Sequence, residues 1–246
     1  MLSTKSLIWI GILLVLFLAW VAFGYFSVRN IEQPQYSVIK QADGYEIREY
    51  APYIVAETMR QEGFDDALNS GFMVVADYIF GNNTAKEPIA MTTPVTTETS
   101  EPIAMTAPVI SERAEPIAMT APVVSGEDDG NRTVAFVMPS KYSMDTLPKP
   151  NDSRVKIREV PARKVAVLRF SGWYGAQKIA QKEQQLRELL ERDGLKYRTL
   201  SFAGYNPPWT PPFMTRNEIW AELVEGGVEK AEEISIFEKI SLGTFE

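Results

Sequence analysis

The feature that most constrains this chain is an uncharged apolar run near its N-terminus. Residues 7–26 form 20 consecutive positions without a charged side chain. As a helix rising about 1.5 Å per residue, this run extends roughly 30 Å, the thickness of a bilayer's hydrocarbon core. Trp9 lies near one end of the run, and Trp20 and Tyr25 lie near the other, where amphipathic rings favour the membrane interface. The sequence therefore predicts a transmembrane anchor over residues 1–30.

The charges that flank the run bear on its orientation. Lys5 and the terminal amine precede it and Arg29 follows it, a slight bias that favours an internal N-terminus and an extracytoplasmic domain. The alternative is a cleaved secretory signal, with Ala-Phe-Gly at residues 22–24 as a weak cleavage site. Because the apolar run continues beyond that site, a single-pass anchor is favoured.

The composition excludes several classes of function. The 246-residue chain has a formal net charge of −7, whereas a nucleic-acid-binding protein needs a basic face. The chain contains no cysteine, which excludes disulfides, thiolate metal sites and cysteine nucleophiles. It contains no histidine either, which excludes Ser-His-Asp catalysis and histidine ligation of zinc or iron.

The pattern of apolar residues beyond a short linker at residues 31–35 predicts the same order of elements twice: strand, strand, helix, strand, strand. Strands are indicated where apolar and polar residues alternate or where β-forming residues cluster. These segments are residues 45–50, 53–58, 133–138, 155–160, 164–170, 196–205 and 218–224.

Two helices are predicted from apolar positions that recur on one helical face. They lie at residues 65–80 and 176–193, and each is followed by a glycine that can end it. Two such βαββ-like units pair naturally into a sheet or barrel flanked by two helices. We therefore expect one α+β domain at residues 36–226, followed by a tail at residues 227–246 that forms an extra strand or helix.

A proline- and threonine-rich segment occurs three times at a spacing of 14 residues. The copies are residues 87–95, 101–109 and 115–123. Such a composition predicts extended, exposed chain, so we expect a loop at residues 87–125 in which the third copy pairs with the sheet. A local duplication without function is the alternative. Met91, Met105 and Met119 hold equivalent positions and are either soft metal ligands or, more commonly, packing residues.

These pieces together resemble the SOUL haem-binding protein family. The stretches that carry the resemblance are YEIREY at 45–50, IAMTAPV at 117–123, FVMPS at 136–140, VAVLRFSG at 165–172, AGYNPP at 203–208 and RNEIW at 216–220. They occur in the family's order across about residues 37–223. The resemblance implies a distorted β-barrel of two βαββ-like units with two helices. It also implies that haem or a related tetrapyrrole binds in a shallow apolar cleft beside the first helix.

Carried onto this chain, the resemblance implies a specific set of cofactor-binding residues. They are Asn69, Phe72, Met73 and Ala76 on the first predicted helix, and Trp209, Met214 and Arg216 near the rim. Phe72, Met73 and Trp209 would supply an apolar bed, and Arg216 a cation for the porphyrin propionates. Alternatively, Phe72 faces the core and Trp209 caps a rigid loop, while Arg216 pairs with Glu218. Because the chain has no histidine, the iron would be coordinated by Met, Tyr or Lys, or the haem would be held by apolar contact alone. No separate metal site is expected.

Two other functions stay open. The predicted barrel also resembles GyrI-like ligand-binding domains, some of which are hydrolytic, with Glu222 as the acid and Tyr174 or Tyr205 as its proton partner. The tripled loop would instead serve as a docking strand for a protein partner in an interaction module. We favour a membrane-anchored binding protein, and not an enzyme, for haem or a related tetrapyrrole.

Overall fold

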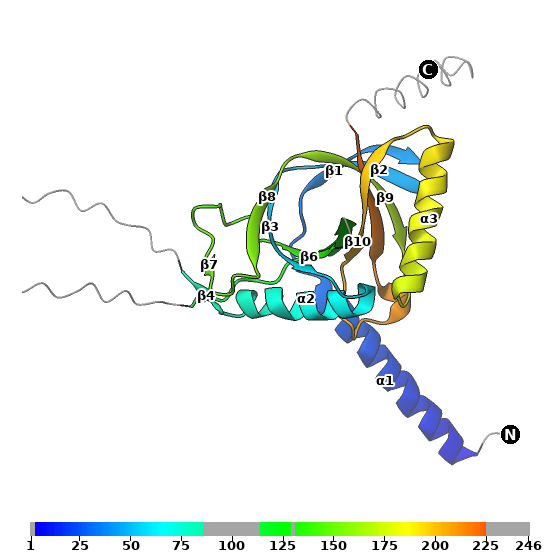
Figure 1. The fold of residues 1–246 in the computed structure, drawn as a ribbon. Helices are drawn as coiled ribbons and strands as arrows, with labels where there is room; N and C mark the ends of the chain where they lie inside the picture. Colours follow the sequence, from blue (N-terminus) through cyan, green and yellow to red (C-terminus); the bar gives the residue numbers. More distant parts are fainter. Residues whose placement is uncertain (1–2, 86–113, 129–130, 225–246) are drawn as a thin grey trace, which may run out of the picture.

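The computed structural model describes residues 3–85, 114–128 and 131–224 (Figure 1). Within these ranges the chain forms a long N-terminal helix and a curled antiparallel sheet with two helices on its outer face. The first two copies of the tripled segment and the predicted tail at residues 227–246 lie outside the described residues.

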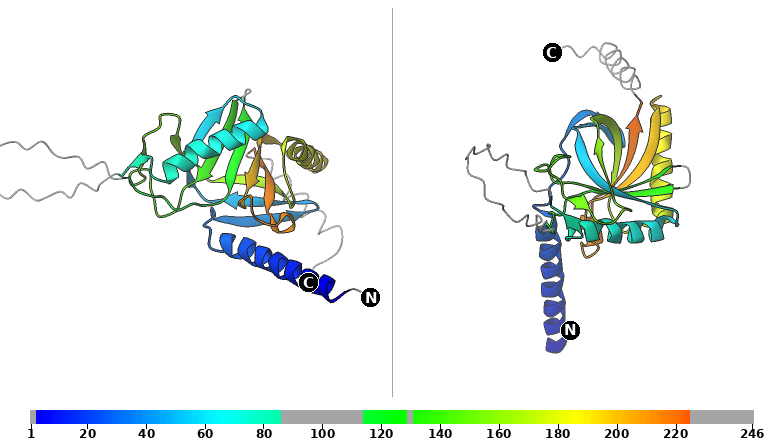
Figure 2. Two further views of the ribbon diagram at one scale, coloured as in Figure 1. Left: turned by 90° about the horizontal axis from the view of Figure 1, so that it is seen from below. Right: turned by 60° about the vertical axis from the view of Figure 1, so that its left-hand side comes forward.

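Helix α1 (Thr4–Val28) is the predicted apolar helix. Ser3 caps it, because the Ser3 hydroxyl accepts a hydrogen bond from Ser6 N at 3.2 Å and so satisfies one of the free N–H groups of the first turn. Almost all of its side chains are exposed, and the helix extends away from the sheet (Figures 1 and 2). Its length and composition are sufficient to cross a membrane, so the apolar helix predicted from the sequence is confirmed.

Nine strands form one antiparallel sheet in the described part of the chain, in the order β1-β2-β9-β11-β10-β5-β6-β3-β8. Their bounds are β1 (Tyr36–Ala42), β2 (Tyr45–Tyr50), β3 (Tyr53–Arg60), β5 (Val123–Asp128), β6 (Asn131–Val137), β8 (Lys156–Val160), β9 (Arg163–Phe170), β10 (Tyr197–Gly204) and β11 (Asn217–Leu223). Two short strands, β4 (Asn83–Thr84) and β7 (Lys149–Pro150), pair separately. The α+β class is confirmed. The strand order ends at β1 and β8, so the described strands form a strongly curled open sheet rather than a closed barrel.

Helices α2 (Phe64–Ile79) and α3 (Ala176–Arg192) cover the outer face of the sheet, each within one residue of its predicted bounds. α2 crosses β3 and β6, and Gly71 permits the close approach: a Cβ at this position would lie 2.7 Å from Val134 Cγ2. α3 packs over β9 and β11 through Ile179, Leu186 and Leu190. The two predicted helices are therefore confirmed, and both face the sheet with their apolar side.

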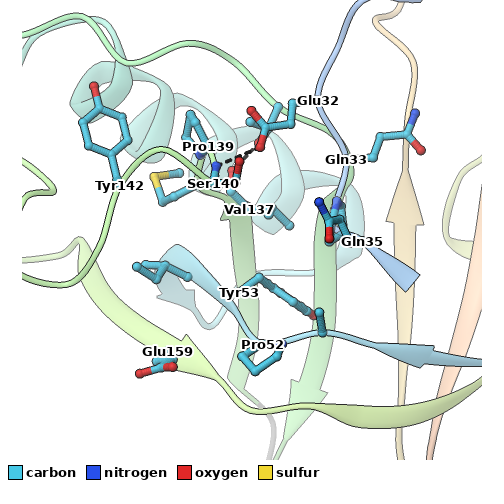
Figure 3. Close-up of a pocket in the computed structure, with 15 residues that line it drawn as sticks. Glu32, Gln33, Gln35, Pro52, Tyr53, Val137, Pro139, Ser140, Tyr142 and Glu159 are labelled. Carbon is cyan, nitrogen blue, oxygen red and sulfur yellow. Dashed lines mark hydrogen bonds between the residues drawn. The ribbon is translucent and has the colours of Figure 1, made fainter. Parts of the chain in front are cut away.

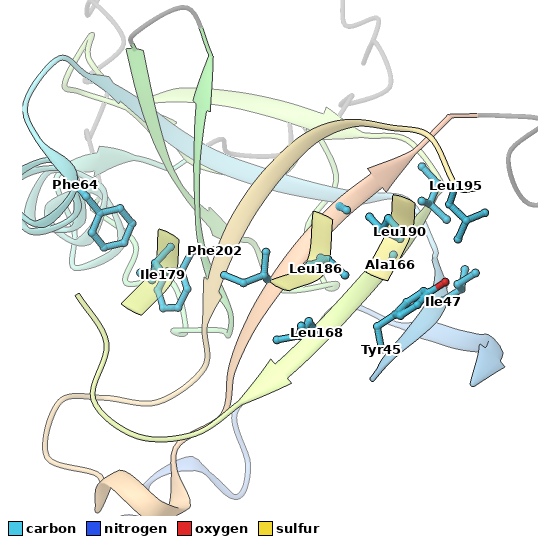
Figure 4. Close-up of a cluster of buried hydrophobic side chains, with 13 residues drawn as sticks. Tyr45, Ile47, Phe64, Ala166, Leu168, Ile179, Leu186, Leu190, Leu195 and Phe202 are labelled. Carbon is cyan, nitrogen blue, oxygen red and sulfur yellow. The ribbon is translucent and has the colours of Figure 1, made fainter. Parts of the chain in front are cut away.

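Both faces of the central strands are buried, because the sheet curls around its own inner side chains. In β9, Ala166 and Leu168 face the outer core beneath α3 (Figure 4). Val165 and Val167 belong to the inner core, where they pack with Trp220 of β11. Neighbouring residues of one strand thus serve two cores, which is why residues 165–168 in the middle of β9 are all apolar.

The third copy of the tripled segment lies against the domain. Ile117 N donates to Ile79 O at 2.9 Å, and Ala121 N donates to Glu32 O at 2.9 Å. Val123, its last residue, begins β5 and pairs with both β6 and β10. The pairing predicted for this copy is therefore observed.

The order of the strands relates the two halves of the domain. Apart from β1, it reads β2-β9-β11-β10 from one end and β8-β3-β6-β5 from the other. Each half therefore places its first strand beside the second strand of the other half. Whether the halves are copies of one βαββ unit stays a prediction. β1 was not predicted: it is an edge strand whose exposed residues lack a clear alternation.

Candidate functional site

One end of the domain gathers the segments that the sequence singled out. The loops at residues 171–175 and 205–216 meet there, since Gly172 N donates to Pro212 O at 2.9 Å and Asn217 Nδ2 donates to Gly172 O at 3.0 Å. α2 lies across this end, and α1 runs away from it (Figures 1 and 2). We refer to the outward side of α2 together with the two loops as the α1-side end.

The four predicted residues of α2 divide between surface and core. Asn69 is exposed, and Met73 is 66% exposed on the outward side of the helix. Ala76 is buried, and Phe72 is half-buried with its ring centroid 5.1 Å from that of Phe136. Asn69 and Met73 are thus the two that can touch a ligand on the surface, while Phe72 and Ala76 lie beneath them, which agrees with the alternative reading of Phe72 as a core residue.

The predicted residues of the loop after β10 face α1 more than α2. Trp209 is 51% exposed, and its ring centroid lies 6.4 Å from that of Phe23 on α1. Its carbonyl oxygen accepts a hydrogen bond from Trp20 Nε1 at 2.7 Å. Met214 is half-buried in the short 3₁₀ helix η1 (Pro212–Met214). This loop therefore contacts the N-terminal helix and holds it against the domain.

Arg216 is already engaged within the protein. Its Nε donates to Glu218 Oε1 at 2.7 Å, and its Nη1 donates to Gln33 Oε1 at 2.9 Å. The guanidinium carbon lies 3.8 Å from the centroid of the Tyr205 ring. Nη2 is buried and has no hydrogen-bond partner among the described residues. The predicted alternative, pairing with Glu218, is observed, and the one nitrogen of Arg216 without a partner is shielded from the surface.

Glu218 is the centre of a buried polar cluster on the inner face of the sheet. Its side chain is 0% exposed and accepts hydrogen bonds from Arg48 Nη1 at 3.0 Å and Nη2 at 3.1 Å. Tyr205 Oη and Trp220 Nε1 also donate to it, at 2.9 and 2.8 Å. Every lone pair of the carboxylate thus has a donor close by, as a buried charge requires.

The ionisation of this cluster follows from burial and charge. Burial raises the pKa of the Glu218 carboxyl, but the hydrogen bond from Arg48 and the charges of Arg216 and Arg48 outweigh it and hold the pKa below its usual range. Burial also raises the pKa of Tyr50, a ring neighbour of Trp220, to about 12. Glu218 is therefore ionised at neutral pH and balances its arginines. Sequence reasoning missed this role, because Arg48 and Glu218 sit in alternating strand patterns that are typical of a half-exposed strand.

A cavity of about 500 Å³ lies elsewhere, between the linker at residues 32–35 and the ends of β3 and β6 (Figure 3). Glu32 lines it and accepts a hydrogen bond from Ser140 N at 2.8 Å. Glu159 lines it too, and neither a lysine nor an arginine is among the described residues of its wall. The wall contains none of the predicted site residues. Two carboxylates without a cation make it a poor site for an anionic ligand.

The arrangement proposed for a hydrolase is not formed around Glu222. This carboxylate pairs with Arg163 Nη1 at 2.7 Å and Arg198 Nη1 at 3.7 Å. Tyr205 donates instead to Glu218, and the ring of Tyr174 packs on Phe202 with centroids 4.7 Å apart. Glu222 therefore serves as an ion-pair partner on the sheet. In the described ranges, no group of three or more acidic, cysteine or histidine side chains could hold a metal ion.

This chain is an α+β protein with a curled antiparallel sheet and two outer helices. A proline-rich loop of the domain contacts the apolar N-terminal helix. The family model described as SOUL heme-binding protein matches residues 31–222. The chain therefore belongs to the SOUL heme-binding protein family, as the sequence resemblance predicted.

Two heme-binding proteins and one solved structure match the chain at low sequence identity. Heme-binding protein 2 of Homo sapiens is 28% identical over 183 residues, covering 73% of this chain and 78% of the relative. Heme-binding protein 1 of Bos taurus is 28% identical over 162 residues, covering 63% and 70%. Among solved structures, the EcmrR C-terminal domain matches with a TM-score of 0.48 at 10% identity, covering 78% of this chain and 99% of that one.

Proposed function

We propose that this protein binds haem or a related tetrapyrrole at the α1-side end of its domain, and that α1 anchors it in a membrane. Family membership supports the class of ligand, because the relatives are named as heme-binding proteins. The observation that supports the location is the exposure of large apolar side chains on the elements of this end. They are Met73 on α2, Phe80 at the end of α2, Trp173 in the loop at residues 171–175, and Trp209 and Phe213 in the loop at residues 205–216.

The surface fits the ring of a porphyrin better than its iron or its propionates. Met73 and the exposed aromatic rings can cover a flat apolar face. Arg216 has an unpartnered Nη2, but this atom is buried, so the side chain would have to turn outward to meet a carboxylate. With no histidine in the chain, Met73 offers an exposed thioether as the ligand for iron on this surface. A haem held in this way would supply a redox-active iron, with most of the binding coming from apolar contact.

The anchor and the domain boundaries are part of the same proposal. Residues 1–30 form the single-pass anchor, residues 31–35 the linker, and residues 36–226 the binding domain. The fraction of α1 that is buried is small, which argues against a role as a core helix. The charge bias around the helix favours an extracytoplasmic domain.

Haemin titration of the full chain in phosphatidylcholine nanodiscs tests the function. We expect a Soret shift and quenching of tryptophan fluorescence, because three of the five tryptophans, Trp20, Trp173 and Trp209, lie at or beside the α1-side end. Absence of both changes at micromolar haemin in protein-containing discs, compared with empty discs, contradicts the proposal.

A pair of methionine variants tests the location. Met73→Glu removes an exposed apolar side chain and places a carboxylate near the propionates. The lost apolar burial is worth roughly 1.5–3 kcal/mol, so we expect haemin affinity to fall at least about tenfold. Met59→Glu is the matched control, because Met59 is also exposed, at 56%, but lies on β3 next to Ser153 and Lys156, outside the proposed site. Equal affinity of the two variants would remove α2 from the site.

A further inference from the structure

Helix α1 contacts one loop of the domain between residues 17 and 24. The ring centroids of Phe17 and Phe213 lie 6.2 Å apart, and Trp20 Nε1 bonds to the Trp209 carbonyl. Closer to the end of the helix, a Cβ at Gly24 would lie 2.5 Å from Pro211 Cδ, so glycine is needed for the contact. The tip of the loop at residues 205–216 therefore follows α1 back toward its N-terminus.

The length of α1 determines where this loop lies if α1 spans a bilayer. Phe17 precedes the end of the apolar run, at residue 26, by nine residues, or about 13 Å of helix. If the loop stayed in water, only residues 7–16 would be left to cross the membrane, roughly 15 Å for a core of roughly 30 Å. The full run is needed to span, so the loop that touches Phe17 must lie below the membrane surface.

The loop is chemically suited to that depth. Residues 207–215 (PPWTPPFMT) carry no charge, and Phe213 and Trp209 expose 59% and 51% of their surface. Four of these nine residues are prolines, which have no N–H to satisfy. Three other N–H groups of the loop donate to carbonyl oxygens within it. Thr210 N donates to Pro207 O at 3.0 Å, Met214 N to Pro211 O at 2.9 Å, and Thr215 N to Pro212 O at 3.2 Å. Backbone donors paired inside the loop are what a hydrocarbon environment demands.

We propose that the tip of this loop, residues 207–215, inserts into the lipid bilayer beside α1, which makes lipid a direct partner of the domain. The inference rests on the proposed anchor. The exposed acids of α2, Asp65, Asp66 and Asp77, keep that helix out of the hydrocarbon, so insertion stops at the loop. Because the tip at residues 207–215 has no basic residue, its insertion depends on apolar contact and needs no anionic lipid.

Fluorophores at single cysteines test the depth of the loop in the full chain, which has no native cysteine. An NBD label is placed at Phe213→Cys in the loop, at Leu14→Cys near the middle of α1, or at Lys196→Cys, an exposed position after α3. Each protein is reconstituted in phosphatidylcholine vesicles with or without acyl-chain doxyl lipid. We expect strong quenching and a blue-shifted emission at positions 14 and 213, and neither at position 196.

Three results overturn the inference, and the first two differ in what they say about the anchor. Quenching at position 14 with a water-like signal at position 213 leaves the anchor in place and refutes loop insertion. A water-like signal at both positions refutes the anchor and the insertion together. If quenching at position 213 requires phosphatidylglycerol in the vesicles, insertion by apolar contact is also refuted.

Discussion

Replacing Glu218 by glutamine tests the buried polar cluster. Glu218 is 0% exposed, and it balances Arg48, whose side chain is 2% exposed, as well as Arg216. Glutamine keeps the shape of the side chain but removes its charge, and its amide nitrogen faces donors where an acceptor is required. Arg48 is then compensated by Glu46 alone, whose side chain is 21% exposed.

The expected loss of stability follows from the burial of the partners. Breaking a buried ion pair by removing one partner costs about 3–5 kcal/mol, because the remaining charge stays out of water. That is roughly two to three and a half powers of ten in the folding equilibrium constant, at about 1.4 kcal/mol for each tenfold change. The matched control is Glu46→Gln, since Glu46 bonds to the same arginine but is reached by water. We expect about 1 kcal/mol for this more exposed pair.

Urea unfolding followed by near-ultraviolet circular dichroism measures both variants in detergent, with the wild-type chain alongside. We expect a much lower midpoint for Glu218→Gln than for Glu46→Gln, with little change in the slope. If the two midpoints fall by the same amount, the buried carboxylate is not what compensates the arginines, and the reasoning is wrong.

Three further predictions concern other parts of the fold. The folded pKa of Glu218 is below its unfolded value of about 4.3, so ionised Glu218 stabilises the fold fully above about pH 4.3, and this stabilisation is lost as the pH falls through the folded pKa. The urea midpoint of the wild-type chain should therefore decline below about pH 4, and that of Glu218→Gln should decline less. Gly71→Ala should lower the unfolding free energy by up to about 2 kcal/mol, since overpacking against Val134 exceeds the gain in helix propensity. Gly63→Ala, where an added Cβ meets nothing within 4 Å, should cost only the smaller penalty of Ala at the N-cap of α2, about 0.5–1 kcal/mol, and equal effects would contradict close packing of α2 on β6. Deleting residues 87–114 should leave the melting temperature unchanged within about 4 °C or raise it. The two ends of the deleted segment are already held close together, because the Asn83 side chain bonds to the Glu115 backbone at 2.8 and 3.0 Å. A fall of more than about 8 °C would show that the segment supports the fold.

The sequence predicted the elements well, because helix and strand periods are local properties. α2 and α3 each carry one apolar face, and β9 is a short apolar run, so each could be recognised without its neighbours. β1 could not, because an edge strand is exposed and needs no apolar alternation. Curling of the sheet was also invisible, although it buries the charged residues of β2 and β11 on the inner face.

The candidate site was harder to predict, since its contacts join distant parts of the chain. Arg48 and Glu218 are 170 residues apart, and Trp20 and Trp209 are 189 apart. A list of residues with suitable chemistry identified Arg216, but the structure shows that Glu218 and Gln33 occupy two of its three nitrogens. The exposed Phe213 was missed, because in the sequence nothing distinguishes an aromatic residue that contacts α1 from one that caps a loop.

Hydrogen exchange of the full chain in nanodiscs, with and without metal-free protoporphyrin IX, tests the location of the ligand most directly. Peptides from residues 64–80 should gain protection on binding, while peptides from β8 should not change. Bound porphyrin that protects only the cavity wall at residues 32–35 and 137–142, or protects no peptide of the α1-side end, would contradict the account.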